Sequence, residues 1–297
     1  MEEDSVTGVV SRARSTEEDP GSSKRNAPVD TLLAMSLSQA DRAALTQMFD
    51  TEADLDRWRL RAHKVEEPAS ASDLALDDKI FAPMAISQLA RLSLVLSGEH
   101  LRLALDALHA EQLYPSSHFT VLRGALVGAS QGVWILSPED RGERRERGLT
   151  VLSELYKELD KYYGSLSGLS LDDQEKLEDQ QKWLSGRRAE VAELRTTRAD
   201  LNLTDAIRKS AEDTFASSGH HEAVRRLWRE MSADAHVLGW SLFQRSNFGP
   251  ADRRTGIGEG QAPGSPGHVA EAFLASYQTL KHGWSLFDRR CEQQAKI

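Results

Sequence analysis

Residues 117–136 read SHFTVLRGALVGASQGVWIL, and this stretch decides the fold. It is apolar along most of its length, and Gly124, Gly128 and Gly132 recur every four residues along one helical face. Glycine inside a helix costs roughly 1 kcal/mol per position relative to alanine. We therefore expect another helix backbone to approach this face closely, because such a contact compensates for that cost.

The preceding segment, residues 80–113, has the pattern of a second long helix. Large apolar residues recur at three- to five-residue steps, at positions 86, 89, 92, 96 and 101, which is typical of a helix with a wide apolar stripe. Gly98 is a place where this helix could bend or divide. Tyr114-Pro115 then stops it, and Ser116-Ser117 supplies an N-cap for the helix that follows.

Further helices are predicted on both sides of this pair. Downstream they cover about 138–163, with Pro138 at the first helical position, then 205–217, a long helix from His220 to Asn247, and 268–294. Upstream, two short helices lie between 30 and 63; Ser36 or Ser38 caps the first, and Leu55 and Trp58 give the second an apolar face. The charges of residues 140–148, DRGERRERG, alternate in sign, which predicts a solvated, salt-bridged face.

Residues 171–198 form a polar helix with two interpretations. Leu177, Leu184, Val191 and Leu194 follow a heptad-like spacing among charged residues. In the first interpretation the helix is a protruding antiparallel arm on the surface of the protein. In the second, it forms a coiled-coil contact with a protein partner.

The predicted fold class is all-α, an antiparallel helical bundle with this polar arm and a disordered N-terminal tail. Residues 1–28 mix acids, Arg, Ser, Gly and Pro without periodicity, so we expect disorder there. Residues 29–75 would hold the short helices and a linker. Residues 76–297 would form the bundle, with the arm at about 165–200 and a flexible loop at 249–267.

Composition excludes several classes of function. The net charge of −9 gives no support to general nucleic-acid binding, although a local basic site is compatible with it. The single cysteine, Cys291, excludes an internal disulfide and any multi-cysteine metal site. The chain starts with acids after Met1, and no uninterrupted apolar run reaches the ~20 residues that span a bilayer. We expect a cytoplasmic protein with no membrane contact, no cofactor and no metal.

Residues 227–245, LWREMSADAHVLGWSLFQR, contain the strongest candidate for chemistry. Arg229 and His236 are seven positions apart, so on a helix they differ by only about 20° in direction. Ser232 lies between them on nearly the same stripe. One polar strip therefore carries a fixed cation, a hydroxyl and an imidazole.

This segment resembles the signature of the HEPN superfamily, in which Arg is followed by four to six residues and then His, late in an all-helical domain. The Ser-Ala-Asp-Ala-His segment at 232–236 and the upstream helix at 118–145 are also similar to a group of HEPN-like actinobacterial proteins. Together these segments cover under a fifth of the chain, and a compatible helical pattern covers about 80–290.

The resemblance implies a helical bundle that forms a homodimer and acts as a metal-independent ribonuclease, in a toxin or phage-defence system. Arg229 and His236 of two subunits would then meet in one cleft. His236 would move a proton, Arg229 would hold the phosphate, and Ser232 and Glu230 would assist them. The product would be a cyclic phosphate. We assign RNA binding to Arg123, Arg225 and Arg226.

The chain departs from those similar proteins at Val127, where they tend to carry a Glu. This departure, the net acidity and the polar arm favour an alternative function, a non-catalytic interaction or scaffold protein with a protein partner. A third hypothesis is a nucleotide or small-molecule sensor that uses a cleft under Arg123 and Arg229. The last alternative is that Arg229 and His236 have a purely structural role, in which they hydrogen-bond to neighbouring helices or face water.

Overall fold

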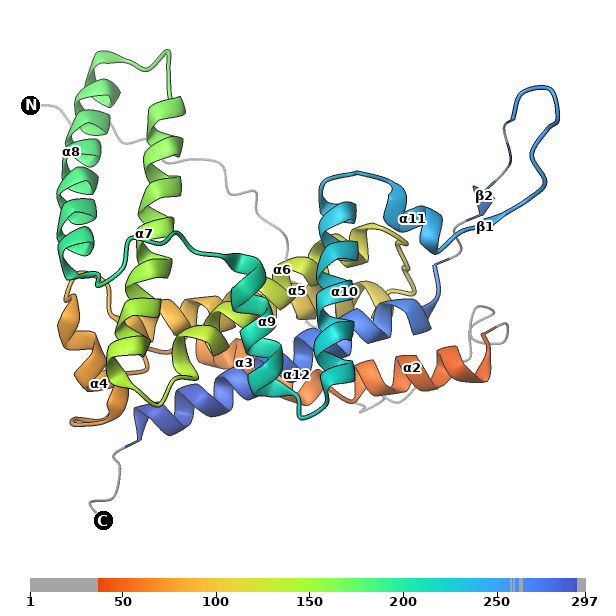
Figure 1. Cartoon of the computed structure of the whole chain (residues 1–297), viewed down its shortest axis with the longest axis horizontal. Coiled ribbons are helices and arrows are strands. Elements are labelled where there is room, and N and C mark those ends of the chain that lie inside the picture. Colours follow the sequence, from red (N-terminus) through yellow and green to blue (C-terminus); the bar gives the residue numbers. More distant parts are fainter. Residues whose placement is uncertain (1–36, 257, 259, 262–263, 293–297) are drawn as a thin grey trace, which may run out of the picture. The chain divides into compact units, whose positions relative to one another are not determined.

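The computed structural model describes residues 37–256, 258, 260–261 and 264–292 (Figure 1). The predicted tail at 1–28 lies outside the described residues, as does part of the predicted loop at 249–267. The described helices belong to one compact unit that begins at Ser38.

Among the described residues the regular secondary structure is α-helical, apart from a short 3-10 turn and two strands of two residues each, so the all-α prediction is confirmed. The strands pair antiparallel, Asn247 with Gln261 and Phe248 with Gly260. In chain order the elements are α2 (Gln39–Phe49), α3 (Glu52–Ala62), α4 (Asp73–Asp77), η1 (Asp78–Ile80), α5 (Ile86–His109), α6 (Ser117–Leu136), α7 (Arg141–Ser165), α8 (Leu171–Leu194), α9 (Leu203–Thr214), α10 (Ser218–Ala235), α11 (Trp240–Gln244), β1 (Asn247–Phe248), β2 (Gly260–Gln261) and α12 (Pro266–Cys291).

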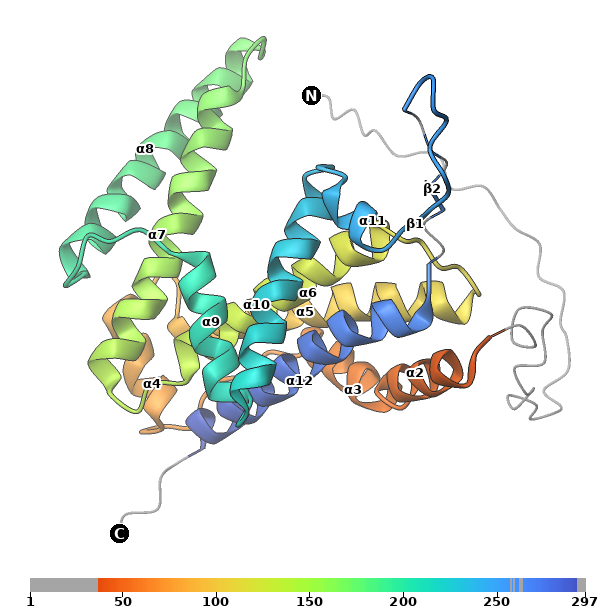
Figure 2. The ribbon, with the colours of Figure 1, turned by 45° about the vertical axis from the view of Figure 1, so that its right-hand side comes forward.

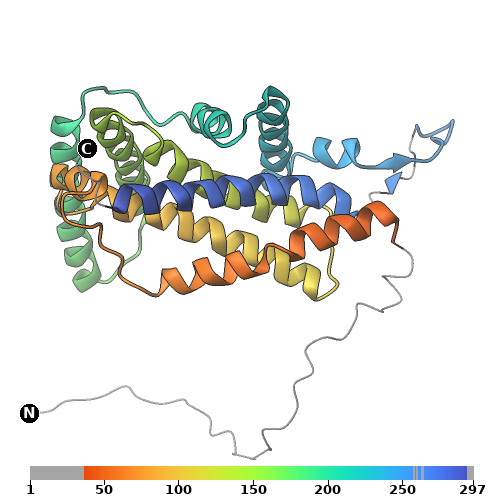
Figure 3. The same ribbon diagram turned by 90° about the horizontal axis from the view of Figure 1, so that it is seen from below.

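Helix α6 lies at the centre of this unit. It packs against α5, α12, α9 and α10, and Figure 3 shows α12 running along the same layer as α5. Helices α2 and α3, which the sequence analysis assigned to a separate N-terminal segment, pack against α12 and α5 respectively. The cap at Ser38 is confirmed, since its hydroxyl accepts from the backbone N–H of Asp41 at 3.0 Å. Leu55 and Trp58 are buried, as predicted.

Among the described helices, α6 is long and apolar enough to cross a membrane by length and composition. The sequence expectation that no segment has this character is therefore too strict. More than half of the apolar window of α6 is buried inside the protein, which is the pattern of a core helix.

The glycine face of α6 receives α5, so the predicted close helix contact is confirmed. A Cβ added at Gly128 would lie 2.6 Å from the carbonyl oxygen of Ser93, and one at Gly132 would lie 2.5 Å from Leu94. At Gly124 the added atom would meet the ring of His100. Helix α5 runs unbroken past Gly98. At Gly128 the backbone of α5 itself approaches too closely for a Cβ, whereas at Gly124 and Gly132 the close neighbours are side chains of α5.

Helices α7 and α8 form an antiparallel arm that extends beyond the other helices (Figure 2). Leu184 and Val191, the central pair of the heptad-like stripe, are buried, and α8 packs along α7. Trp183 meets the ring of Tyr156 edge-on at 6.2 Å. The apolar stripe of the arm is thus mainly used within the chain, in agreement with the first of its two interpretations.

Glu146, on α7, connects this helix to the segment that follows α8. Its carboxylate accepts hydrogen bonds from the backbone N–H and hydroxyl of Thr196, at 2.7 and 2.9 Å, and from those of Thr197, at 3.3 and 2.8 Å. Burial raises the pKa of this carboxyl, but the hydrogen bonds outweigh burial and hold the pKa below its usual range. These contacts therefore stabilise the fold above the ordinary pKa of glutamate, and the stabilisation is lost as pH falls through the lowered pKa.

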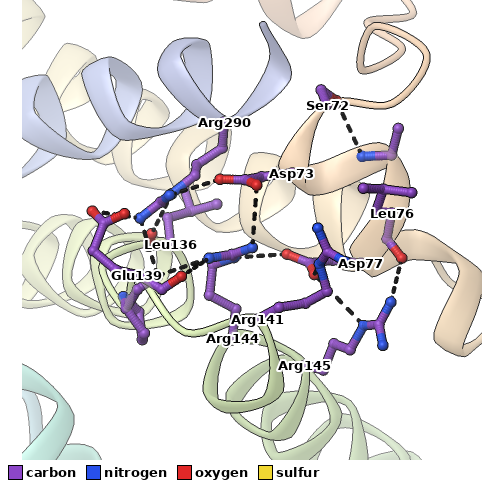
Figure 4. Close-up of polar contacts among 12 residues, drawn as sticks. Ser72, Asp73, Leu76, Asp77, Leu136, Glu139, Arg141, Arg144, Arg145 and Arg290 are labelled. Carbon is purple, nitrogen blue, oxygen red and sulfur yellow. Dashed lines mark hydrogen bonds and ion pairs between the residues drawn. The ribbon is translucent and has the colours of Figure 1, made fainter. Parts of the chain in front are cut away.

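A buried network of guanidinium groups joins α4, the α6–α7 connection and α12 (Figure 4). Arg144 is 1% exposed; its Nε donates to Asp77 at 2.7 Å and one Nη donates to the carbonyl of Pro138 at 3.0 Å. Arg290 is 2% exposed and donates to Asp73 at 2.7 Å and to the carbonyl of Pro138 at 3.0 Å. Two charged side chains from distant parts of the chain thus donate to the same backbone carbonyl.

Arg144 corrects two sequence predictions. The face at 140–148 is not simply solvated, because Arg144 lies in the interior, where Asp77 and backbone carbonyls satisfy its donors. Pro138 is not the first residue of α7 either. The helix begins at Arg141, and Asp140 caps it by accepting from the backbone N–H of Glu143 at 2.8 Å. The carbonyl of Pro138 lies before the helix and accepts hydrogen bonds from Arg144 and Arg290 in the buried network.

Replacing Gly128 with alanine is expected to destabilise the fold by about 1–3 kcal/mol, because the new Cβ would overlap the Ser93 carbonyl of α5. Gly186→Ala in α8 is the matched control. No neighbouring atom lies within 4 Å of its added Cβ, so alanine should stabilise that helix by up to about 1 kcal/mol. Thermal unfolding followed by circular dichroism measures both. An unchanged melting temperature for Gly128→Ala would contradict the close contact.

Candidate functional site

Helix α10 ends at Ala235, so the prediction of one long helix from His220 to Asn247 is wrong. His236 is the C-cap, and Val237 adopts a left-handed conformation with φ 55°. The N–H of Leu238 bonds to the carbonyl of Ala233 at 2.9 Å, and the N–H of Val237 bonds to that of Asp234 at 3.0 Å. This pair of bonds is a Schellman motif, which satisfies the last carbonyls of the helix. Gly239, with φ 75°, completes the turn, and α11 follows.

A buried ion pair, which sequence reasoning missed, holds this turn in place. The carboxylate of Asp234 accepts from Arg245 at 2.7 and 2.8 Å and from the hydroxyl of Ser116 at 3.0 Å. The Arg245 guanidinium also lies over the ring of Phe119, 3.8 Å from its centroid. Ser116 therefore makes no side-chain cap to α6, although the sequence suggested one. No local pattern marks Asp234, because its partners come from distant parts of the chain.

Arg229 and His236 are both exposed. Within the described part of the chain, neither side chain has a hydrogen bond or an ion pair. Seven positions separate them along α10 and its cap, which is about 10 Å of helix axis. A single subunit thus presents both groups to solvent without bringing them together.

Arg229 lines a hollow of about 270 Å³ on the side of α10, here called the α10 hollow. Its other lining residues are Glu222, Arg225, Arg226, Glu230, Trp240 and Gln244. His236, Ser232 and Arg123 do not line it. The structure therefore gathers four of the seven predicted site residues at one hollow and leaves the predicted proton carrier outside.

Ser232 and Arg123 are joined to each other instead. The Nε of Arg123, on α6, donates to the Ser232 hydroxyl at 3.3 Å, and that hydroxyl donates to the carbonyl of Trp228 at 2.7 Å. The Arg123 guanidinium lies 4.8 Å from the centroid of the Trp228 ring. These contacts attach α10 to α6. Arg123 does not line the hollow that Arg229 lines, and the cleft under both arginines in the sensor hypothesis stays a prediction.

The other predicted residues are paired within the hollow. Arg225 contacts Glu222 at 2.6 Å. Arg226 contacts Glu230 at 3.2 Å and also bonds to Glu271 of α12. Arg225 and Arg226 are thus neutralised locally, Arg225 by Glu222 and Arg226 by Glu230 and Glu271.

Five large apolar side chains between residues 237 and 248 are exposed, and one of them, Trp240, also lines the hollow. Val237 is 88% exposed, Leu238 63%, Trp240 40%, Phe243 63% and Phe248 58%. Phe243 and Phe248 meet edge to face, with ring centroids 5.9 Å apart. We call these five residues the apolar surface. Exposure of so many large apolar groups in one short segment is rare unless something binds them.

Chemistry based on a metal or on Cys291 gains no support from the geometry. In the residues that the structure describes, no three His, Cys, Asp or Glu side chains are grouped to hold a metal ion. Burial raises the pKa of Cys291 to about 12, so its reactive thiolate is scarce near neutral pH. The hollow of about 840 Å³ beside this thiol is lined by Arg61, Glu66 and Asp288, which pair with one another.

Val237→Gly is expected to stabilise the protein by about 1 kcal/mol, because a β-branched residue is strained at positive φ and glycine is not. Val237→Ile, which keeps the branch, is the matched control and should leave the melting temperature unchanged. Differential scanning calorimetry measures both variants. A lower melting temperature for Val237→Gly would show that the valine side chain contributes packing that outweighs the strain.

Comparison with models of protein families, with curated protein sequences and with solved structures finds no match to this chain. The resemblance at 118–145 and 227–245 thus gains no support from similarity over the whole chain. Any function has to be argued from the α10 hollow, from the exposed pair Arg229 and His236, and from the apolar surface.

Proposed function

We propose that this chain is a non-catalytic helical interaction protein that binds a protein partner through the apolar surface. The observation that carries the proposal is the exposure of five large apolar side chains between residues 237 and 248. Leaving such side chains in water costs roughly 25 cal/mol for every Å² of apolar area that a partner would cover. The phenyl rings of Phe243 and Phe248 and the indole of Trp240 belong to the side-chain types that are enriched in the cores of protein interfaces.

The backbone beneath this surface supports the proposal. The Asp234–Arg245 ion pair and the Schellman motif fix the turn, so the side chains are held in place before any partner arrives. A surface organised in advance loses less conformational entropy on binding. The strained Val237 is consistent with this, because a valine at positive φ persists only where the surrounding structure imposes it.

The arm is the less favoured site for a partner. Most of its apolar stripe already packs against α7, because Leu184 and Val191 are buried. The remaining face of α8 carries mostly charged residues. A partner would find less apolar area there than at the end of α10.

The test is affinity capture with the full chain from cells that contain it, followed by quantitative mass spectrometry. Leu238→Ser together with Phe243→Ser is expected to lower the retention of the partner at least tenfold. The matched control is Leu171→Ser, which alters a leucine on the arm that is even more exposed, at 83%. Circular dichroism verifies that both proteins fold. If every captured protein is retained equally by the double variant, the proposal fails.

A second candidate function is the metal-independent ribonuclease implied by the HEPN resemblance. The observation that favours it is that Arg229 and His236 are both exposed and without a described partner on one side of α10. One subunit does not join them at a hollow, so this function requires a homodimer. Two copies would have to bring the imidazole of one subunit near the guanidinium of the other.

For this candidate, cleavage of single-stranded RNA should persist in EDTA and fall by about 10²- to 10⁴-fold in His236→Ala, the usual contribution of a general acid or base. His220→Ala, at another exposed histidine of α10, should cleave normally. Gel analysis of a labelled RNA, with a test for cyclic phosphate ends, measures the activity. Equal cleavage by His236→Ala and the unchanged chain would exclude this role.

A further inference from the structure

We propose that the partner inserts a single acidic side chain into the α10 hollow, against Arg229, from within an otherwise apolar segment. The inference rests on the proposed function and adds the chemistry of the partner to it. Its basis is an imbalance of charge on α10.

Arg229 is the cation of the hollow that lacks a counter-ion among the described residues. Arg225 has Glu222, and Arg226 has Glu230 and Glu271. Both neighbouring arginines are therefore already paired with acids and need nothing from a ligand. Arg229 thus offers a guanidinium whose donors are open to a carboxylate, which is the acceptor that best matches its two parallel N–H groups.

The hollow has the size and lining for such a group. Its volume of about 270 Å³ corresponds to roughly nine water molecules at liquid density, enough for an Asp or Glu side chain. Gln244 adds an amide donor to the lining. Trp240 belongs both to this lining and to the apolar surface, so a single bound segment would fill the hollow and cover the apolar residues together.

The flanking charges restrict what the hollow accepts. Three arginines and two glutamates line it, which leaves a single positive charge that one carboxylate balances and that a run of acids or a nucleic-acid backbone would exceed. The chain also carries a net charge of −9, which opposes a polyanion. One isolated carboxylate between apolar side chains satisfies both restrictions. A protein segment of this composition is therefore favoured over RNA.

The experiment uses the full chain and a display library of random 16-residue peptides as the probe. Selection is expected to enrich peptides with one Asp or Glu flanked by apolar residues. Arg229→Gln should raise the Kd of an enriched peptide at least tenfold. Replacing the peptide's acid by its amide should have the same effect, and the two changes together should cost no more than either alone. Arg208→Gln, at a paired arginine of α9, should leave the Kd unchanged.

The outcomes separate this inference from the proposed function. Peptides that lose binding in Leu238→Ser with Phe243→Ser, but show no acidic preference and no response to Arg229→Gln, overturn the inference alone. A selection that yields no peptide dependent on Leu238 and Phe243 overturns both. If a single-stranded RNA 20-mer binds through Arg229 while no acidic peptide is enriched, the inference is also overturned, and the ribonuclease candidate gains support.

Discussion

The buried pair of Arg144 and Asp77 is the interaction on which the arrangement of the helices depends. Arg144 is 1% exposed and Asp77 is fully buried, so removing either one would leave an uncompensated charge in the interior. Burial raises the pKa of Asp77, and the hydrogen bond and charge of Arg144 oppose that rise. The pair is more than local, because Arg144 and Arg290 also share the carbonyl of Pro138. The end of α6, the start of α7 and the end of α12 are thereby fixed together.

A fixed α6 determines where the candidate site lies. The glycines of α6 place α5 against one side, and α10 packs against another side through the contacts of Arg123 with Ser232 and Trp228. Ser116, at the start of α6, bonds to Asp234 and so positions the turn after α10. In the structure Arg123 and Ser232 hold α10 against α6, whereas the sequence analysis expected Ser232 to assist catalysis and Arg123 to bind a ligand.

Sequence periodicity predicted α5, α6 and the arm well, although two members of the α5 stripe, Leu92 and Leu96, are exposed. It failed at α10 because the helical spacing of large residues continues through Leu238 and Phe243, and Val237 is not a residue that normally ends a helix. It also failed at Arg144, because alternating charges look the same whether the partner is water or a buried Asp77. The sequence also could not predict which arginine in α10 has no acidic partner among the described residues, because Glu271 contacts Arg226 from a helix far away in the sequence.

The position of His236 links the two candidate functions. It lies between Arg229 and the apolar surface, directly before the strained Val237. A partner that covers Val237 and pairs with Arg229 would occupy both groups that cleavage of RNA requires. A copy of the chain bound in this way could not act as the ribonuclease at the same moment. The two candidate functions would therefore exclude each other on one copy of the chain, and a partner bound there would inhibit any chemistry that Arg229 and His236 performed.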